Sequence, residues 1–186
     1  MYMYTNRGNA LYNELLKAGL TYEILQSLSY RTQLGKSLVN SLRHFDKELL
    51  FDDINKVINF YNNSEIMDEL AIDYRIKSED SCLRKYDKFY PDMRVEKTFN
   101  DVLGFRMLCD NYDEILNHDN IDKIRIVDMS QGKANDDGYR GVHLYFQLDH
   151  SHYPIEIQMN TYYDRQINNW LHKYLYLSLI HISEPT

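Results

Sequence analysis

The chain has 186 residues and a net charge of -7 at pH 7, with 21 Lys and Arg against 28 Asp and Glu. This length fits one domain with a proper hydrophobic core. The acidic balance argues against a general nucleic-acid coat, and no apolar run approaches the roughly 20 residues that a membrane helix needs.

The two ends and the cysteines indicate the cellular setting. The N-terminus, MYMYTNRGNALYNELL, lacks the charged start, apolar block and cleavage site of a secretory signal. Cys82 and Cys109 lie in apolar contexts without metal-ligand spacing, so we expect reduced thiols and a cytoplasmic protein. The last ten residues, 177–186, resemble a translated sequencing adapter, and we leave them out of the fold prediction.

Residues 1–69 show the apolar spacing of helices, as in Leu11, Leu15 and Leu16. We predict two or three helices, joined near Gly19 and again near residues 50–53. From residue 70 the pattern changes to alternation, which predicts a short strand over 70–76. This change places a boundary between an N-terminal helical portion, 1–69, and a second unit, 70–176.

A helix is predicted to follow Ser78, a residue suited to an N-cap. Its spacing puts Ser81, Lys85 and Lys88 on one face and Cys82, Tyr86 and Phe89 on the other. Residues 74–106 hold eight Lys and Arg against six Asp and Glu, a basic island in an acidic chain. Such an island indicates a local anion site, although a solvated helix face gives the same pattern.

The remaining elements predict a mixed sheet. We expect a strand within 101–110, a short helix near 112–116, a strand over 121–127, a loop over 129–138 and a final helix over 161–176. Between them, two alternating segments predict a hairpin whose polar face carries His143, Glu156 and Gln158. Helices followed by a mixed sheet flanked by helices indicate an α+β fold.

Four motifs in order, YRIKSEDSCLRKYDK, DVLGFR, DGYRGVH and PIEIQMNT, resemble the synthetase domain of the RelA/SpoT family. The resemblance covers about residues 70–176 and implies a nucleotidyltransferase-like fold. It implies a small, synthetase-only GTP pyrophosphokinase, which moves the β,γ-pyrophosphate of ATP to the ribose 3'-hydroxyl of GDP or GTP and releases AMP. The family's hydrolase activity is not expected, because the only His-Asp pair, His118-Asp119, sits in a polar loop.

By resemblance, one group of residues binds ATP. Fork-shaped Arg and mobile Lys suit the concentrated charge of its phosphates. Lys88 stands where the family usually has Arg, which predicts weaker ATP binding. The expected ATP-binding residues are Arg75, Lys77, Ser81, Lys85, Lys88 and Arg106.

The reaction also implies a divalent cation, Mg²⁺, because it offsets charge on the phosphates. By resemblance, Asp101 and Glu156 are the catalytic carboxylates and the metal ligands, and Glu156 helps to deprotonate the acceptor hydroxyl. Taken singly, each could be a strand cap or an exposed strand residue.

The acceptor side is expected to centre on Tyr139, whose ring would stack on guanine, behind the tight turn that Gly138 allows. The expected acceptor-binding residues are Lys133, Tyr139, His143 and Gln158. Asn160 stands where the family usually has Arg, so we expect one cation fewer near the acceptor.

Two alternatives to this function stay open. The acceptor could instead be the 3'-end of tRNA, as in toxin members, although the acidic balance disfavours it. The protein could also be a non-catalytic nucleotide-binding module. A homo-oligomer is compatible with the resemblance, and no membrane partner is expected.

Overall fold

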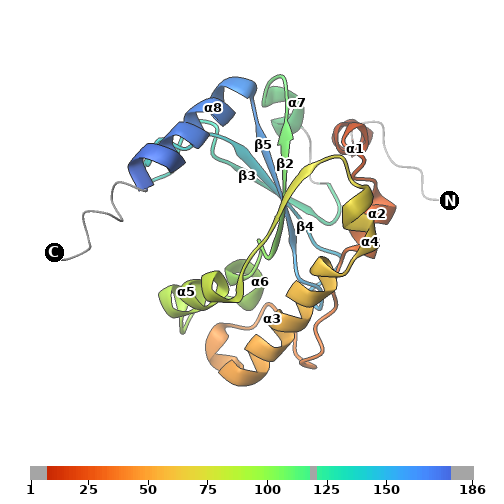
Figure 1. Ribbon diagram of the computed structural model, residues 1–186, viewed down its shortest axis with the longest axis vertical. Helices are drawn as coiled ribbons and strands as arrows, with labels where there is room; N and C mark the ends of the chain where they lie inside the picture. Colours follow the sequence, from red (N-terminus) through yellow and green to blue (C-terminus); the bar gives the residue numbers. More distant parts are fainter. Residues whose placement is uncertain (1–7, 118–120, 177–186) are drawn as a thin grey trace.

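A computed structural model describes residues 8–117 and 121–176 of the chain. Figure 1 shows a central sheet with helices on both sides. In chain order the elements are α1 (Gly8–Lys17), α2 (Tyr22–Ser27), the 3₁₀ turn η1 (Leu42–His44), α3 (Lys47–Asn62), α4 (Glu65–Glu69), β1 (Asp73–Ile76), α5 (Glu79–Phe89), α6 (Val95–Thr98), β2 (Leu103–Leu108), α7 (Asp113–Leu116), β3 (Ile124–Asp128), β4 (Val142–Phe146), β5 (Ile155–Asn160), α8 (Tyr162–Leu171) and the π-helical turn η2 (His172–Tyr176).

The five strands form one mixed sheet in the order β1-β2-β5-β4-β3. The central pair, β2 and β5, is parallel, and the other three pairs are antiparallel. The predicted α+β fold with a mixed sheet and flanking helices is therefore confirmed. Because β2 and β5 run in the same direction, side chains at their starts lie at the same edge of the sheet.

Alternation along the strands divides the sheet into two faces. The apolar face includes Phe105, Leu144 and Ile157, all with no exposed surface. The opposite face carries one polar row across the whole sheet, because the register pairs its members strand by strand. That row is Arg75, Gly104, Glu156, Tyr145 and Arg125.

The N-terminal helices cover the apolar face. Figure 1 shows α1, α2 and α4 on one side of the sheet and α8 on the other. Tyr22 of α2 packs edge-on against Phe146 of β4, with ring centroids 5.8 Å apart. Between α3 and the start of β5, Tyr153 donates a 2.7 Å hydrogen bond to buried Asp53. The helices and the sheet thus share one hydrophobic core.

One predicted helix junction is wrong. The chain does not break at 50–53, because α3 runs through these residues from its N-cap, Asp46, whose side chain accepts from the Leu49 N–H. The apolar stripe continues through buried Phe51, Ile54 and Val57, so the helix has a reason to persist. The break lies earlier, in the non-helical stretch 28–46 that contains only η1.

The described residues up to 69 hold four α-helices, α1 to α4, where two or three were predicted, and the elements predicted after residue 69 are present with shifted ends. The strand expected over 70–76 is shorter, and the one expected over 121–127 begins three residues later. The division at residue 69 stays a prediction. The 177–186 tail and the His118-Asp119 pair lie outside the described residues. Within the described ranges, no helix has both the length and the apolar character to cross a membrane.

Candidate active site

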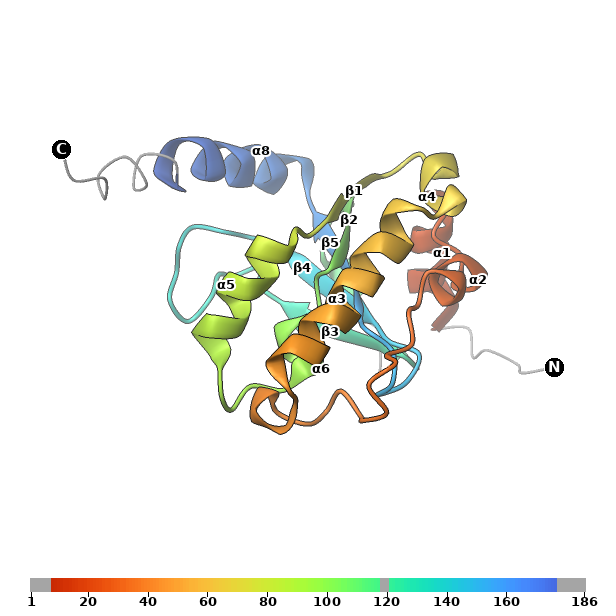
Figure 2. The ribbon, with the colours of Figure 1, turned by 60° about the horizontal axis from the view of Figure 1, so that its bottom comes forward.

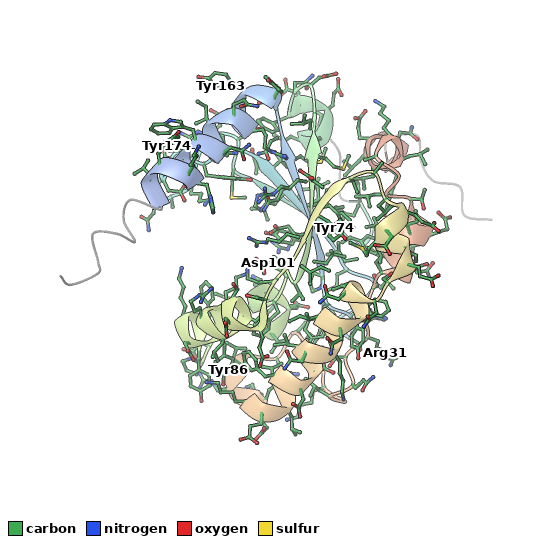
Figure 3. All side chains as sticks on the ribbon, in the orientation of Figure 1. Arg31, Tyr74, Tyr86, Asp101, Tyr163 and Tyr174 are labelled. Atoms are coloured by element: carbon green, nitrogen blue, oxygen red, sulfur yellow. The ribbon has the colours of Figure 1, made fainter. Side chains whose placement is uncertain are left out.

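The first half of the site is built around Asp101, immediately before β2. The antiparallel pairing of β1 and β2 continues to Lys77, whose N–H donates to the Val102 carbonyl at 2.8 Å. This places the Lys77 Nζ 2.5 Å from Asp101 Oδ2, and α5 brings the Lys85 Nζ to 2.9 Å from Oδ1. Figure 3 shows Asp101 where α5 meets the sheet.

These two ammonium groups determine the ionisation of Asp101. Burial works to raise the pKa of Asp101, but Lys85 and Lys77 outweigh it and hold the pKa below its usual value. The carboxylate is therefore charged at neutral pH. Arg75 lies at the edge of the cluster, with its Nη2 4.0 Å from Oδ2 and its side chain more than half exposed.

Two other members of the expected ATP-binding set, Ser81 and Lys88, also lie on α5. Ser78 caps the helix by accepting from the Ser81 N–H, which confirms the predicted N-cap. The Ser81 hydroxyl also contacts Ser78 and Arg84. Lys88 lies on the last turn with its ammonium 5.2 Å from the centre of the Phe89 ring. No contact in the described part of the chain joins Lys88 to Asp101.

The second half of the site is built around Glu156 of β5, which is only 6% exposed. Gln158 donates to Oε1 at 2.8 Å and Tyr145 donates to Oε2 at 3.0 Å. His143 Nδ1 lies 3.3 Å from the Tyr145 hydroxyl and 3.5 Å from Oε2. On the other side of the ring, Nε2 lies 2.7 Å from the Tyr139 hydroxyl.

Counting protons fixes the direction of this network. The single hydroxyl proton of Tyr145 goes to Glu156, so Tyr145 must accept from His143, and Nδ1 carries the ring proton. Nε2 is then the acceptor for Tyr139. Burial lowers the pKa of His143, which agrees with a neutral ring, and burial raises the pKa of Tyr145 far above its usual value. Tyr145 and Gln158 thus both donate to the Glu156 carboxylate, and His143 supports Tyr145 from behind.

The loop before β4 carries the expected acceptor residues. Gly138 has a positive φ of 86°, a left-handed conformation that suits the tight turn predicted here. Lys133 lies beside Tyr139, its Nζ 4.9 Å from the ring centre, and also pairs with Asp137 at 3.1 Å. The structure therefore brings Lys133, Tyr139 and His143 together with Gln158.

A cavity of about 500 Å³ opens beside this loop. It lies between the sheet, the 129–141 loop and α8, and a nucleotide base and sugar fit such a volume. Its lining includes Arg106, Lys133, Tyr139, Gln158, Asn160 and Arg165. The Asp101 cluster does not line this cavity, so the site has two neighbouring parts.

The parallel pairing of β2 and β5 relates the two carboxylates. Glu156 lies opposite Gly104, three residues after Asp101. Asp101 also acts electrostatically on both His143 and Tyr145, the neighbours of Glu156. Among the described residues, no cluster of three or more His, Cys, Asp or Glu could hold a metal by itself. Two carboxylates do fit Mg²⁺, which takes one or two from the protein and its other ligands from substrate phosphates and water.

Sequence reasoning missed two residues of the site. Tyr145 carried a signal, because it alternates with His143 onto the polar face. Arg165 gave no signal in the sequence, because its position relative to the sheet depends on how α8 is oriented after β5. Its Nε donates to Asn160 Oδ1 at 3.1 Å and its Nη2 to the Met107 carbonyl at 3.3 Å.

A family model described as a region found in RelA / SpoT proteins matches residues 74–178. The match covers the sheet, α5 and α8, and with them both halves of the site. The chain belongs to this family. No curated protein sequence matches the chain.

Several solved structures are similar to the chain. Small alarmone synthetase 1 from Bacillus subtilis is 20% identical, with 70% of this chain and 73% of that chain covered and a TM-score of 0.39. Small alarmone synthetase 2 from the same organism is 20% identical, with 75% and 78% covered and a TM-score of 0.41. A GTP pyrophosphokinase family protein from Streptococcus pneumoniae is 16% identical, with 69% and 76% covered and a TM-score of 0.41.

Proposed function

We propose that the protein is a synthetase-only GTP pyrophosphokinase that transfers the β,γ-pyrophosphate of ATP to the 3'-hydroxyl of GDP or GTP. The observation that carries the proposal is the pair of buried carboxylates on one face of the sheet. Asp101 is held by cations, and Glu156 is held by neutral hydrogen-bond donors. The cations around Asp101 suit the binding of a donor polyphosphate, and the neutral surroundings of Glu156 suit a general base.

On the donor side, Lys77 and Lys85 would neutralise phosphate charge. They are already oriented by Asp101, so binding ATP needs little rearrangement of the two side chains. Arg75 and Arg106, which flank this region on β1 and β2, would hold the adenine side and further phosphate oxygens. Asp101 and Glu156 would hold Mg²⁺, which when bound offsets the charge that builds on the bridging oxygen during transfer.

On the acceptor side, Glu156 would accept the proton of the 3'-hydroxyl as that oxygen attacks the β-phosphorus and AMP leaves. Tyr139 would present a flat platform to guanine, with His143 beneath it. Structures of small alarmone synthetase 1 from Bacillus subtilis are bound to pppGpp and to AMPCPP. We propose the same two classes of ligand, a guanosine polyphosphate and an ATP-like donor, for this chain.

The test uses ATP labelled at the γ-phosphate, with Mg²⁺ and, in parallel, GDP, GTP and deacylated tRNA. We expect labelled guanosine tetra- or pentaphosphate, a loss of at least about 100-fold in Glu156→Gln and Asp101→Asn, and retained ATP binding in Glu156→Gln. Glu65→Gln, which removes a charge from the exposed surface of α4, is the control and should keep full activity. Label on tRNA alone would establish the toxin reaction instead. Bound ATP without transfer to any acceptor would establish a binding module.

A further inference from the structure

Arg165 reaches the candidate site from outside the family's motifs. It lies on the first turns of α8, and its guanidinium extends across the end of β5 to β2. There it lines the same cavity as Arg106 and Tyr139. The side chain is half-buried, so its charge is only partly hydrated.

The charge of Arg165 has no acidic partner among the residues that the structure describes. Its two hydrogen bonds within the described structure go to neutral oxygens, those of Asn160 and Met107. Burial, and next the nearby charge of Arg106, lower the pKa of Arg165, while Asp73 acts more weakly in the opposite direction. The acid that lines the cavity, Asp137, pairs with Lys133. Two guanidinium groups thus face one cavity, and an anion between them would relieve their repulsion.

The geometry of the guanidinium leaves part of it available. The Nε and Nη2 hydrogen bonds hold one edge of the planar group in place, and Nη1 has no partner in the described structure. A guanidinium group that is already oriented binds phosphate oxygens with little loss of side-chain conformational entropy. The position also explains Asn160, which replaces the arginine usual in the family: its short amide supports a guanidinium that arrives from α8.

We propose that Arg165 binds a 5'-phosphate group of the acceptor nucleotide and supplies the cation that is absent at position 160. The acceptor is favoured over ATP because Arg165 shares its cavity with Tyr139 and Gln158, whereas of the expected ATP-binding residues that the structure describes only Arg106 lines it. The inference rests on the proposed function, since it takes the ligand to be a nucleoside 5'-polyphosphate.

The experiment compares the binding of GDP and guanosine to wild type and Arg165→Gln by calorimetry. Glutamine can still bond to Asn160 but carries no charge. We expect GDP to bind about 10- to 100-fold more weakly to the variant and guanosine to bind unchanged. In the transfer assay, the KM for GDP should rise while the KM for ATP stays constant.

Two further variants sharpen the result. Arg165→Lys keeps the charge without the fork and should lie between wild type and Arg165→Gln. Arg31→Gln removes the same charge far from α8 and the site, as Figure 3 shows, and should match wild type. Thermal melting of each variant checks that it is folded.

Equal losses for GDP and guanosine would overturn the inference, because they would indicate a base contact or a distorted cavity. Unchanged GDP binding, or a loss confined to ATP, would overturn it as well. If wild type transfers nothing yet Arg165→Gln selectively loses GDP binding, the proposed function fails and the phosphate contact stands. If wild type is active and Arg165→Gln equals it, the phosphate contact alone fails.

Discussion

Tyr145 donates its hydroxyl proton to Glu156 from the neighbouring strand, at a distance of 3.0 Å and in direct register. Because Glu156 is also held by Gln158, the plane of the carboxylate is fixed before substrate arrives. Removing the hydroxyl in Tyr145→Phe should lower kcat about tenfold or more, the range found when a residue that orients a functional ligand is lost. Steady-state kinetics should show little change in the KM for ATP.

The control for that variant is Tyr153→Phe, which breaks a 2.7 Å hydrogen bond to Asp53 on the far side of the sheet. It should lower stability and leave kcat unchanged. Adding Tyr145→Phe to Glu156→Gln should cause no further loss, since the hydroxyl acts through the carboxylate. Additive losses would show that Tyr145 acts in another way.

Asp101 predicts how stability depends on pH in the ligand-free protein. Its pKa is lowered below the ordinary 3.8 by Lys85 and Lys77 against the effect of burial. A group whose pKa falls on folding stabilises the protein above its unfolded pKa, and this contribution is lost as the pH falls through the folded pKa. The difference in unfolding free energy between wild type and Asp101→Asn should therefore be constant above about pH 5 and shrink below it. Urea titrations from neutral to acidic pH measure it, and parallel profiles would contradict the assignment.

Tyr139 can be separated into its ring and its hydroxyl. Tyr139→Ala removes the platform and should raise the KM for the guanine nucleotide about tenfold or more, the cost of one lost base stack. Tyr139→Phe keeps the ring and loses the hydroxyl, with its 2.7 Å contact with His143 and its hydrogen bond with Asn160, so its KM should stay near that of wild type. An equal rise in both variants would mean that the hydroxyl, not the ring, serves the acceptor.

Alanine should destabilise the protein at one of two glycines of the sheet region and be tolerated at the other. At Gly141 a Cβ would lie 2.6 Å from Asn160 Nδ2, 2.8 Å from the Tyr139 hydroxyl and 3.2 Å from a backbone carbonyl, so something must move. At Gly104 a Cβ would lie 3.5 Å from Glu156 Oε1, an ordinary contact. Gly141→Ala should lose about 1–3 kcal/mol of unfolding free energy, and Gly104→Ala should stay close to wild type. Chemical denaturation of both variants measures this difference, and equal stabilities would contradict the prediction.

The two cysteines should react slowly with thiol reagents in the folded protein. Burial raises the pKa of Cys82 and of Cys109 to about 11 each, from an ordinary 9.0. Only the thiolate reacts, so its fraction at pH 8 falls about 100-fold. Labelling with an aromatic disulfide should accelerate sharply on denaturation. Rapid labelling of the native protein would contradict these environments.

Local patterns predicted much of the fold. The alternation in β4 and β5 gave the polar face correctly, and Ser78 marked the start of α5, because both signals depend on neighbours in the chain. The junction expected at 50–53 is absent because α3 runs through these residues. The buried apolar residues of α3 continue past this point and keep the helix intact.

The candidate site was less predictable where tertiary geometry sets it. That Lys77 and Lys85 both bind Asp101 depends on the pairing of β1 with β2 and on the angle of α5. Arg165 belongs to a helix whose position no local pattern specifies. Figure 2 shows how far α8 stands from the N-terminal helices that precede the sheet in the sequence.

Contacts between α8 and the 129–141 loop couple the position of the helix to that of the loop. Asn168 of α8 bonds both the N–H and the carbonyl of Arg140, and the Leu171 side chain closes over Gly138, where an added Cβ would meet it at 2.9 Å. The Tyr139 region is therefore held by α8 as well as by the sheet. A tilt of α8 would shift Gly138 and Arg140, the two neighbours of Tyr139 in the chain, and so would move the Tyr139 ring.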